Sequence, residues 1–141
     1  MSTGRNTTAG GNVNADGGGK NGAENAIRHI REYERLEQGW LDGMGVPVTV
    51  EAGKQGEALA NATAEPIGPP IVSPEESGGL EFEWDDNNLE ASIAADGTIT
   101  GYDLDADNDR VGESVFDDAG DAASWLHARL KAASKRKAGG R

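Results

Sequence analysis

Five carboxylates between residues 103 and 113 have a spacing typical of metal chemistry: Asp103, Asp105, Asp107, Asp109 and Glu113. Oxygen ligands at every second position can converge on a hard cation, so this run suggests a calcium site. The run departs from the helix-loop-helix calcium pattern, because its sixth position is Asn108 instead of glycine and its twelfth is Ser114 instead of glutamate. Two interpretations stay open, namely a calcium site and a solvated acidic loop over residues 103–114.

Acidic and apolar side chains alternate in residues 80–85, with leucine, phenylalanine and tryptophan separated by carboxylates. In a β-strand, this alternation places the apolar side chains on one face and the carboxylates on the other. We expect the acidic side to bind a basic protein surface through Glu81, Glu83, Asp85, Asp86 and Glu90. The alternative is a hydrated face whose charges are screened by salt.

Residues 85–88, Asp-Asp-Asn-Asn, are all turn formers and predict a four-residue turn between two strands. Such a turn places all the apolar side chains of both strands on one face. The predicted pairs are Trp84 with Leu89, Phe82 with Ala91, and Leu80 with Ile93. The same register puts Glu83 opposite Glu90, where like charges are destabilising.

Asp96 and Gly97 predict a second turn, whose length decides the face on which Ile99 lies. A two-residue turn sets Tyr102 opposite Ala91 and leaves Ile99 on the outer face. A three-residue loop that ends at Gly97 reverses this assignment. Both lengths are compatible with the sequence.

The two turns predict a meander of three antiparallel strands over residues 79–104. Apolar residues at three- and four-residue spacing predict helices on either side of it in the chain. The expected helices are residues 23–38, 49–64 and 117–133. We also expect Trp40, Trp84 and Trp125, which fall in three different elements, to meet in the core.

The fold class we expect is therefore α+β, with two to three helices on the apolar face of the sheet. One domain covers residues 23–133, and a proline-rich connector at 66–74 leads from the helical half into the sheet. The arm 1–22 has almost no apolar residues, so we expect it to be disordered, as we do the basic tail 134–141.

Charge is distributed unevenly along this chain of net charge −12. Residues 75–121 contain sixteen carboxylates and one base, Arg110, whereas residues 129–141 contain six bases and no acid. The acidic field favours basic partners and solubility. The basic tail has no interleaved aromatic residues, so it predicts at most weak, non-specific contact with nucleic acid.

Signals for catalysis or membrane insertion are weak. The chain has no cysteine, its two histidines lie outside any nucleophile motif, and GGGKNG at 17–22 lacks the hydroxyl residue of a phosphate loop. No apolar run has the length of a membrane span or of a secretory signal. We expect a non-enzymatic, cytoplasmic protein without a membrane contact and, calcium apart, without a cofactor.

Four segments follow one another in a recognisable order: Gly39-Trp40, the proline-rich connector, Gly-Leu-Glu-Phe-Glu-Trp at 79–84, and Asp96-Gly97. In this order, residues 36–104 resemble a group of small bacterial proteins with a Gly-Trp-Asp-Gly segment, a Leu-Glu-Trp strand and a strand that ends in Asp-Gly. Here Leu41 separates the tryptophan from the aspartate. The resemblance implies an α+β accessory protein of a bacterium or phage and carries no activity to particular residues.

These observations favour an acidic interaction protein, such as an inhibitor, an antitoxin-like neutraliser or an accessory subunit. Its partner is a basic protein surface. The alternatives from other classes are a calcium-stabilised structural module, built on the 103–113 run, and a structural component of a phage particle.

Overall fold

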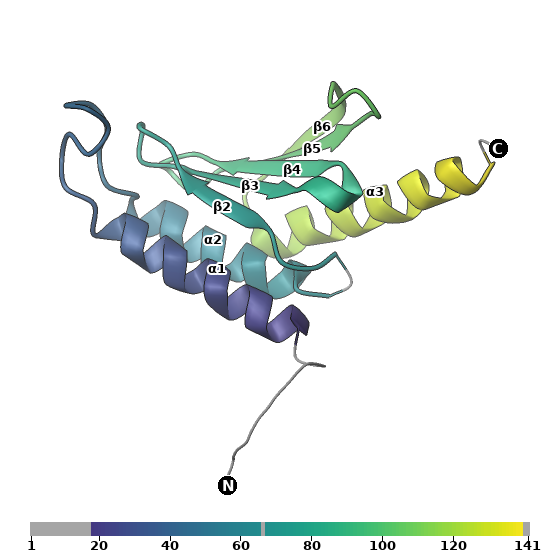
Figure 1. Ribbon diagram of the computed structural model, residues 1–141, viewed down its shortest axis with the longest axis horizontal. Helices are drawn as coiled ribbons and strands as arrows, with labels where there is room; N and C mark the ends of the chain where they lie inside the picture. Colours follow the sequence, from purple (N-terminus) through teal and green to yellow (C-terminus); the bar gives the residue numbers. More distant parts are fainter. Residues whose placement is uncertain (1–17, 66, 140–141) are drawn as a thin grey trace, which may run out of the picture.

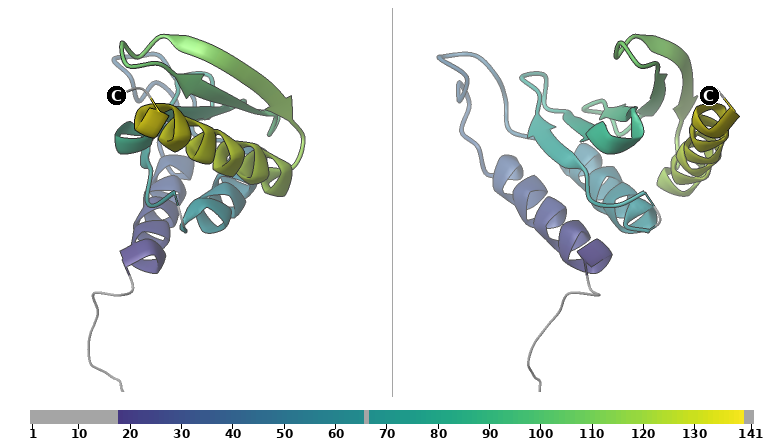
Figure 2. Two further views of the ribbon diagram at one scale, coloured as in Figure 1. Left: turned by 90° about the vertical axis from the view of Figure 1, so that its right-hand side faces the viewer. Right: turned by 45° about the vertical axis from the view of Figure 1, so that its right-hand side comes forward.

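The computed structural model describes the backbone of residues 18–65 and 67–139, and the side chains of 23–65 and 67–130. Within these residues, three helices lie on one face of a five-stranded antiparallel sheet (Figures 1 and 2). The elements in chain order are α1 (Gly18–Glu34), α2 (Val50–Thr63), β2 (Ile71–Pro74), β3 (Leu80–Trp84), the 3₁₀ helix η2 (Asp85–Asn87), β4 (Leu89–Ile93), β5 (Ile99–Leu104), β6 (Arg110–Phe116) and α3 (Ala119–Gly139).

The α+β class is confirmed, but the expected count of three strands is wrong. The sheet has the order β2-β3-β4-β5-β6, because part of the connector forms β2 and part of the acidic loop forms β6. In β6 the apolar pattern is inverted: Val111 and Val115 face outward and are 59% and 60% exposed. The inward positions between these valines are the small residues Gly112 and Ser114, so buried apolar alternation does not predict this strand from the sequence.

The predicted register between β3 and β4 is confirmed at every pair. Trp84 lies opposite Leu89, Phe82 opposite Ala91, and Leu80 opposite Ile93. All six side chains are buried against the helices. Glu83 lies opposite Glu90 on the other face, as the same register requires.

The turn between β4 and β5 is the three-residue loop that ends at Gly97. The Ala94 N–H donates to the Thr98 carbonyl at 2.8 Å, and the Gly97 N–H donates to the Ala94 carbonyl at 2.8 Å. Gly97 has a φ of +95°, which a glycine adopts at no steric cost. Ile99 consequently pairs with Ile93 and is buried on the inner face, so the two-residue alternative is wrong.

The helices differ from expectation mainly at their ends. α1 begins at Gly18 instead of residue 23, and it ends at Glu34 instead of residue 38 because the next turns tighten. The N–H groups of Arg35 and Leu36 donate to carbonyls three residues back, at 3.0 and 3.2 Å. α3 continues to Gly139 instead of ending at residue 133, so the expected tail falls partly within this helix. Residues 1–17 of the expected arm and residues 140–141 of the tail lie outside the described residues.

The N-terminus of α2 is tied to the sheet by Thr49. Its Oγ1 accepts the Ala52 N–H at 3.0 Å, which is the capping bond that a threonine before a helix supplies. The same hydroxyl donates to the Ala95 carbonyl at 2.6 Å, in the turn between β4 and β5. One side chain thus caps the helix and positions it against the sheet.

Glycines in α2 allow close packing of the helical layer. A Cβ at Gly56 would lie 2.7 Å from Leu80 Cδ1 and 3.1 Å from Ile30 Cδ1, and a Cβ at Gly53 would overlap the Glu34 carboxylate. Each glycine lowers the stability of the helix by about 1 kcal/mol relative to alanine. Larger residues at these positions would not fit, because α2 packs closely against α1 and the sheet.

The three tryptophans do not meet in the core, contrary to expectation. Trp84 is buried there, and its Nε1 donates to the Gly68 carbonyl at 3.0 Å. Trp125 of α3 packs on Gly101, where a Cβ would lie 3.0 Å from the indole ring. Trp40 instead packs against Gly45 within its own loop.

We expect Gly101→Ala to lower the free energy of unfolding by about 1–3 kcal/mol, because the added methyl group would press on a rigid ring in a packed core. Gly112→Ala, in the neighbouring strand, is the matched control. Its Cβ would lie 3.5 Å from Asp103 Cβ, an ordinary contact, so its cost is within about 0.5 kcal/mol. Urea denaturation of both variants measures the difference, and equal costs would contradict the packing of Trp125 described here.

Candidate functional site

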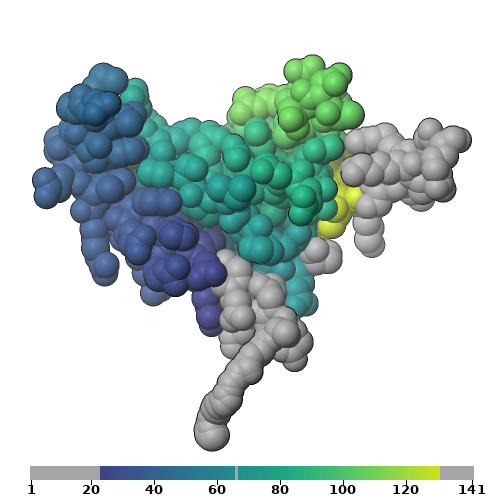
Figure 3. All heavy atoms as spheres, in the orientation of Figure 1, coloured from purple at the N-terminus to yellow at the C-terminus, as the bar shows by residue number. Residues whose placement is uncertain are grey.

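The sheet face opposite the helices carries a row of carboxylates, which we call the acidic face: Glu81 and Glu83 of β3, Glu90 of β4 and Glu113 of β6. The register places Glu83 opposite Glu90, Glu90 opposite Tyr102, and Tyr102 opposite Glu113. All three helices lie on the other side of the sheet, so none of them covers this face (Figure 2). Figure 3 shows the molecule hollowed between the loop after α1 and the turn that joins β5 to β6.

Glu81 is the most perturbed titratable group on the acidic face. Its partial burial, a hydrogen bond with the Glu75 carboxyl group and the charges of Glu75 and Glu90 raise its pKa from the ordinary 4.5 to about 8. Arg110 opposes this rise. At neutral pH the Glu81 carboxyl group is therefore mostly protonated in the folded protein.

Among the described side chains, Arg110 is the base that contacts the acidic face. Its guanidinium carbon lies 3.7 Å from the centroid of the Tyr102 ring, and its Nη2 lies 3.4 Å from Glu90 Oε1. The Arg110 side chain is 51% exposed, so this ion pair is screened by water and contributes at most about 1 kcal/mol. One partly screened cation therefore leaves the face negatively charged.

Three of the five predicted partner-binding residues come together at one corner of the sheet. Glu83, Asp85 and Asp86 line a shallow hollow of about 320 Å³ beside Ile71, which is 55% exposed. Asp85 and Asp86 belong to η2, and both are exposed. Glu90 lies directly opposite Glu83 on β4, and Glu81 lies two residues away from Glu83 on β3, so the five form a band rather than one cluster.

The predicted calcium ligands are divided between two faces and a turn. Asp105, Asp107 and Asp109 are brought together, each with a carboxylate oxygen within 4.8 Å of the others. Asp103 is buried on the inner face, and Glu113 belongs to the acidic face. The five residues therefore do not converge on one point.

The three clustered aspartates already have a structural role in the turn between β5 and β6. Asp105 Oδ1 accepts the N–H groups of Asp107 and Asp109, at 2.9 and 3.0 Å. Asn108 has a φ of +65°. It occupies the left-handed position of this turn, as Gly97 does in the turn between β4 and β5. Calcium takes six to eight oxygen ligands, about twice what these carboxylates offer with one oxygen each. A calcium site here stays a prediction.

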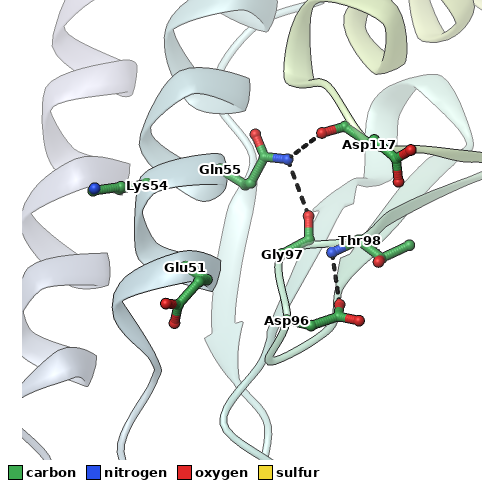
Figure 4. A pocket seen from close by; sticks show the side chains of 7 residues that line it. All are labelled: Glu51, Lys54, Gln55, Asp96, Gly97, Thr98 and Asp117. Atoms are coloured by element: carbon green, nitrogen blue, oxygen red, sulfur yellow. Dashed lines mark hydrogen bonds between the residues drawn. The ribbon is translucent and has the colours of Figure 1, made fainter.

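A second hollow, of about 410 Å³, lies where α2, the turn between β4 and β5, and the start of α3 meet (Figure 4). Gln55 reaches across it, and its Nε2 donates to the carbonyls of Gly97 and Asp117, at 3.1 and 2.7 Å. The Thr98 N–H donates to Asp96 Oδ1 at 2.9 Å and lowers the pKa of Asp96. The polar groups here join neighbouring elements, so we treat this hollow as a structural junction.

Two members of the site were not found from the sequence. Glu75 lies outside every predicted strand, just after β2. It nevertheless raises the pKa of Glu81. Tyr102 was placed opposite Ala91 by the two-residue turn, whereas it lies opposite Glu90. The glycine at position 97, which ends a three-residue loop, was the signal that would have placed Tyr102 on the outer face.

We expect the raised pKa of Glu81 to make stability fall as pH rises. The folded state holds a proton that the unfolded state releases near pH 4.5, so the stabilisation is complete below that pH and is lost as pH approaches 8. Glu81→Gln keeps a neutral side chain and removes this slope. Denaturation between pH 5 and pH 9, values set by those two pKa positions, measures it.

The matched control is Glu83→Gln, which removes a carboxylate from the same strand but leaves the Glu75–Glu81 contact in place. We expect this variant to keep the slope of the parent protein. If Glu81→Gln had the same pH dependence as the parent protein, the raised pKa of Glu81 would be disproved.

No helix within the described residues combines the length and the apolar character needed to cross a membrane. Neither a protein-family model, nor a curated protein, nor a solved structure matches this chain. The resemblance of residues 36–104 to small bacterial proteins stays a prediction, and the function must be argued from the acidic face itself.

Proposed function

We propose that this chain is a non-enzymatic binding protein, and that its acidic face binds the basic surface of a partner protein. An inhibitor or an accessory subunit would act in this way, through occupation of the partner's surface. The observation that carries the proposal is the pairing of Glu83 with Glu90 on a sheet face that none of the three described helices covers.

Like charges directly opposite one another on a sheet cost a few tenths to about 1 kcal/mol. The protein could reduce this cost with cations on neighbouring strands, yet Arg110 is the one base between residues 75 and 121. A basic partner would remove the repulsion between Glu83 and Glu90 when it binds. The free energy released in this way would strengthen binding.

The overall charge supports the same function. A net charge of −12 attracts basic proteins over several ångströms and raises the rate of their encounter, an effect that falls with ionic strength. The half-buried Glu81 makes the charge of the acidic face depend on pH as well. Because its proton is lost as pH approaches 8, the acidic face gains a charge above neutral pH.

We expect poly-L-lysine, as a probe of basic surfaces, to bind the acidic face in preference to other acidic positions. Glu83→Gln combined with Glu90→Gln should weaken binding at low salt by about three- to tenfold, the range for two exposed charge pairs. Backbone amide chemical shifts during the titration should change along β3, β4 and β6. Binding should weaken steeply as salt is added.

The control removes the same number of charges from the helical layer, with Glu24→Gln combined with Glu65→Gln, both at exposed positions. We expect this pair to change the affinity less than twofold, on the scale of screened surface charges. Equal losses in the two double variants, or shifts spread evenly over all acidic segments, would contradict a function located on the acidic face.

A further inference from the structure

A short hairpin after α1, residues 39–45, projects from the molecule and is held by its own backbone. The Gly39 N–H donates to the Gly45 carbonyl at 2.8 Å, and Leu41 and Met44 exchange two hydrogen bonds, at 2.7 and 2.8 Å. Leu41 and Met44 are thus direct cross-strand partners. We call this segment the 39–45 hairpin.

The turn of the 39–45 hairpin has one defined geometry. Asp42 and Gly43 have φ values of +49° and +91°, the pair of left-handed residues that a tight two-residue turn requires. Gly39 and Gly45 also have positive φ, at +84° and +92°. Three glycines and an aspartate in these conformations specify a fixed turn rather than a flexible loop.

Trp40 braces the 39–45 hairpin from the side. Its Nε1 donates to the Val46 carbonyl at 2.7 Å, and a Cβ at Gly45 would lie 2.9 Å from the same nitrogen. The Val46 N–H in turn donates to the Glu76 carbonyl at 2.9 Å, in the turn between β2 and β3. The indole therefore stabilises this projection instead of the core.

This rigid support presents two large apolar side chains to water. Leu41 is 42% exposed and Met44 is 58% exposed. Because they are cross-strand partners, their side chains lie on the same face of the 39–45 hairpin. Single exposed apolar residues are ordinary on protein surfaces. Leu41 and Met44 differ because the hairpin already fixes their backbone, so less conformational entropy is lost when they bind a partner.

The charges around the tip define the kind of surface that it fits. Asp42 lies between the two apolar residues, Glu37 and Glu76 are exposed nearby, and residues 36–49 contain no lysine or arginine. A surface that carries basic residues is therefore the favourable counterpart of the tip, and the acidic sheet face of a second copy is an unfavourable one. Figures 1 and 3 show the 39–45 hairpin beside the β2–β3 turn, at one end of the sheet and rising on the side of the acidic face.

We propose that the 39–45 hairpin docks Leu41 and Met44 into an apolar pocket of a protein partner, and that basic residues form the rim of this pocket. The inference rests on the proposed function for the charge of the partner. It adds an apolar anchor of the kind that dominates the energy of protein interfaces. Asp42 at the tip meets the basic rim.

The test uses cyclic peptides selected from a displayed library against the intact protein, since such peptides are enriched for surfaces that can bind a protein partner. We expect the selected peptides to combine a large apolar side chain with lysine or arginine. Leu41→Ser combined with Met44→Ser should weaken their binding at least about tenfold, as expected for the loss of a buried anchor.

The matched control is Val111→Ser combined with Val115→Ser, an apolar pair on β6 that is at least as exposed, at 59% and 60%, and it should leave binding within about twofold. Gly45→Ala retains both apolar side chains but forces the Trp40 brace apart, and it should also weaken binding by about tenfold if the preformed shape matters. Far-UV circular dichroism and thermal melting verify that each variant is folded.

Peptides that bind equally well to the Leu41→Ser, Met44→Ser variant, or peptides without basic residues, would overturn the inference. The acidic-face variants distinguish it from the proposed function. If Glu83→Gln with Glu90→Gln leaves poly-L-lysine binding unchanged while the 39–45 hairpin variants lose the peptides, the docking inference stands and the proposed function fails.

Discussion

The separation of hydrocarbon and carboxylate across β3 and β4 is the constraint on which the structure depends. Leu80, Phe82 and Trp84 face the helices, and each residue between them is a glutamate that faces the other way. A shift of one residue in either strand would bury carboxylates and expose the core, so the register is strongly specified. The helices cover the apolar side, and the acidic side is left to water as a consequence.

Charge accumulates on the uncovered side because the sheet continues beyond these two strands. β6 adds Glu113 to the row that contains Glu83 and Glu90, and the approach to the β2–β3 turn adds Glu75. Partial burial, together with the neighbouring Glu75 and Glu90 carboxylates, raises the pKa of Glu81, and the proton that it retains reduces the repulsion. Among the described residues, eight large apolar side chains are fully buried. The free energy of their burial offsets the cost of this unfavourable surface. A site that costs stability in the free protein is consistent with one used for binding.

The parts of the fold that sequence reasoning predicted are those in which local pattern and burial agree. The turn at 85–88 and the β3–β4 register both follow from residue types within a few positions. The alternation of β6 does not predict it, because Val111 and Val115 face outward and the inward positions between them are Gly112 and Ser114. An indole is usually buried in a core, which is why the sequence predicts Trp40 there. The three glycines around Trp40 instead adopt positive φ and form a separate hairpin.

The most direct test of the account is the reactivity of single cysteines on β4, since the chain has none of its own. Ala91 is fully buried on the inner face, and its neighbour Ser92 lies on the outer face. We expect a thiol reagent to label Ser92→Cys rapidly in the folded protein and Ala91→Cys slower by on the order of a hundredfold or more, since the latter requires opening of the core. Equal labelling rates at the two positions would contradict the separation of the apolar and acidic faces.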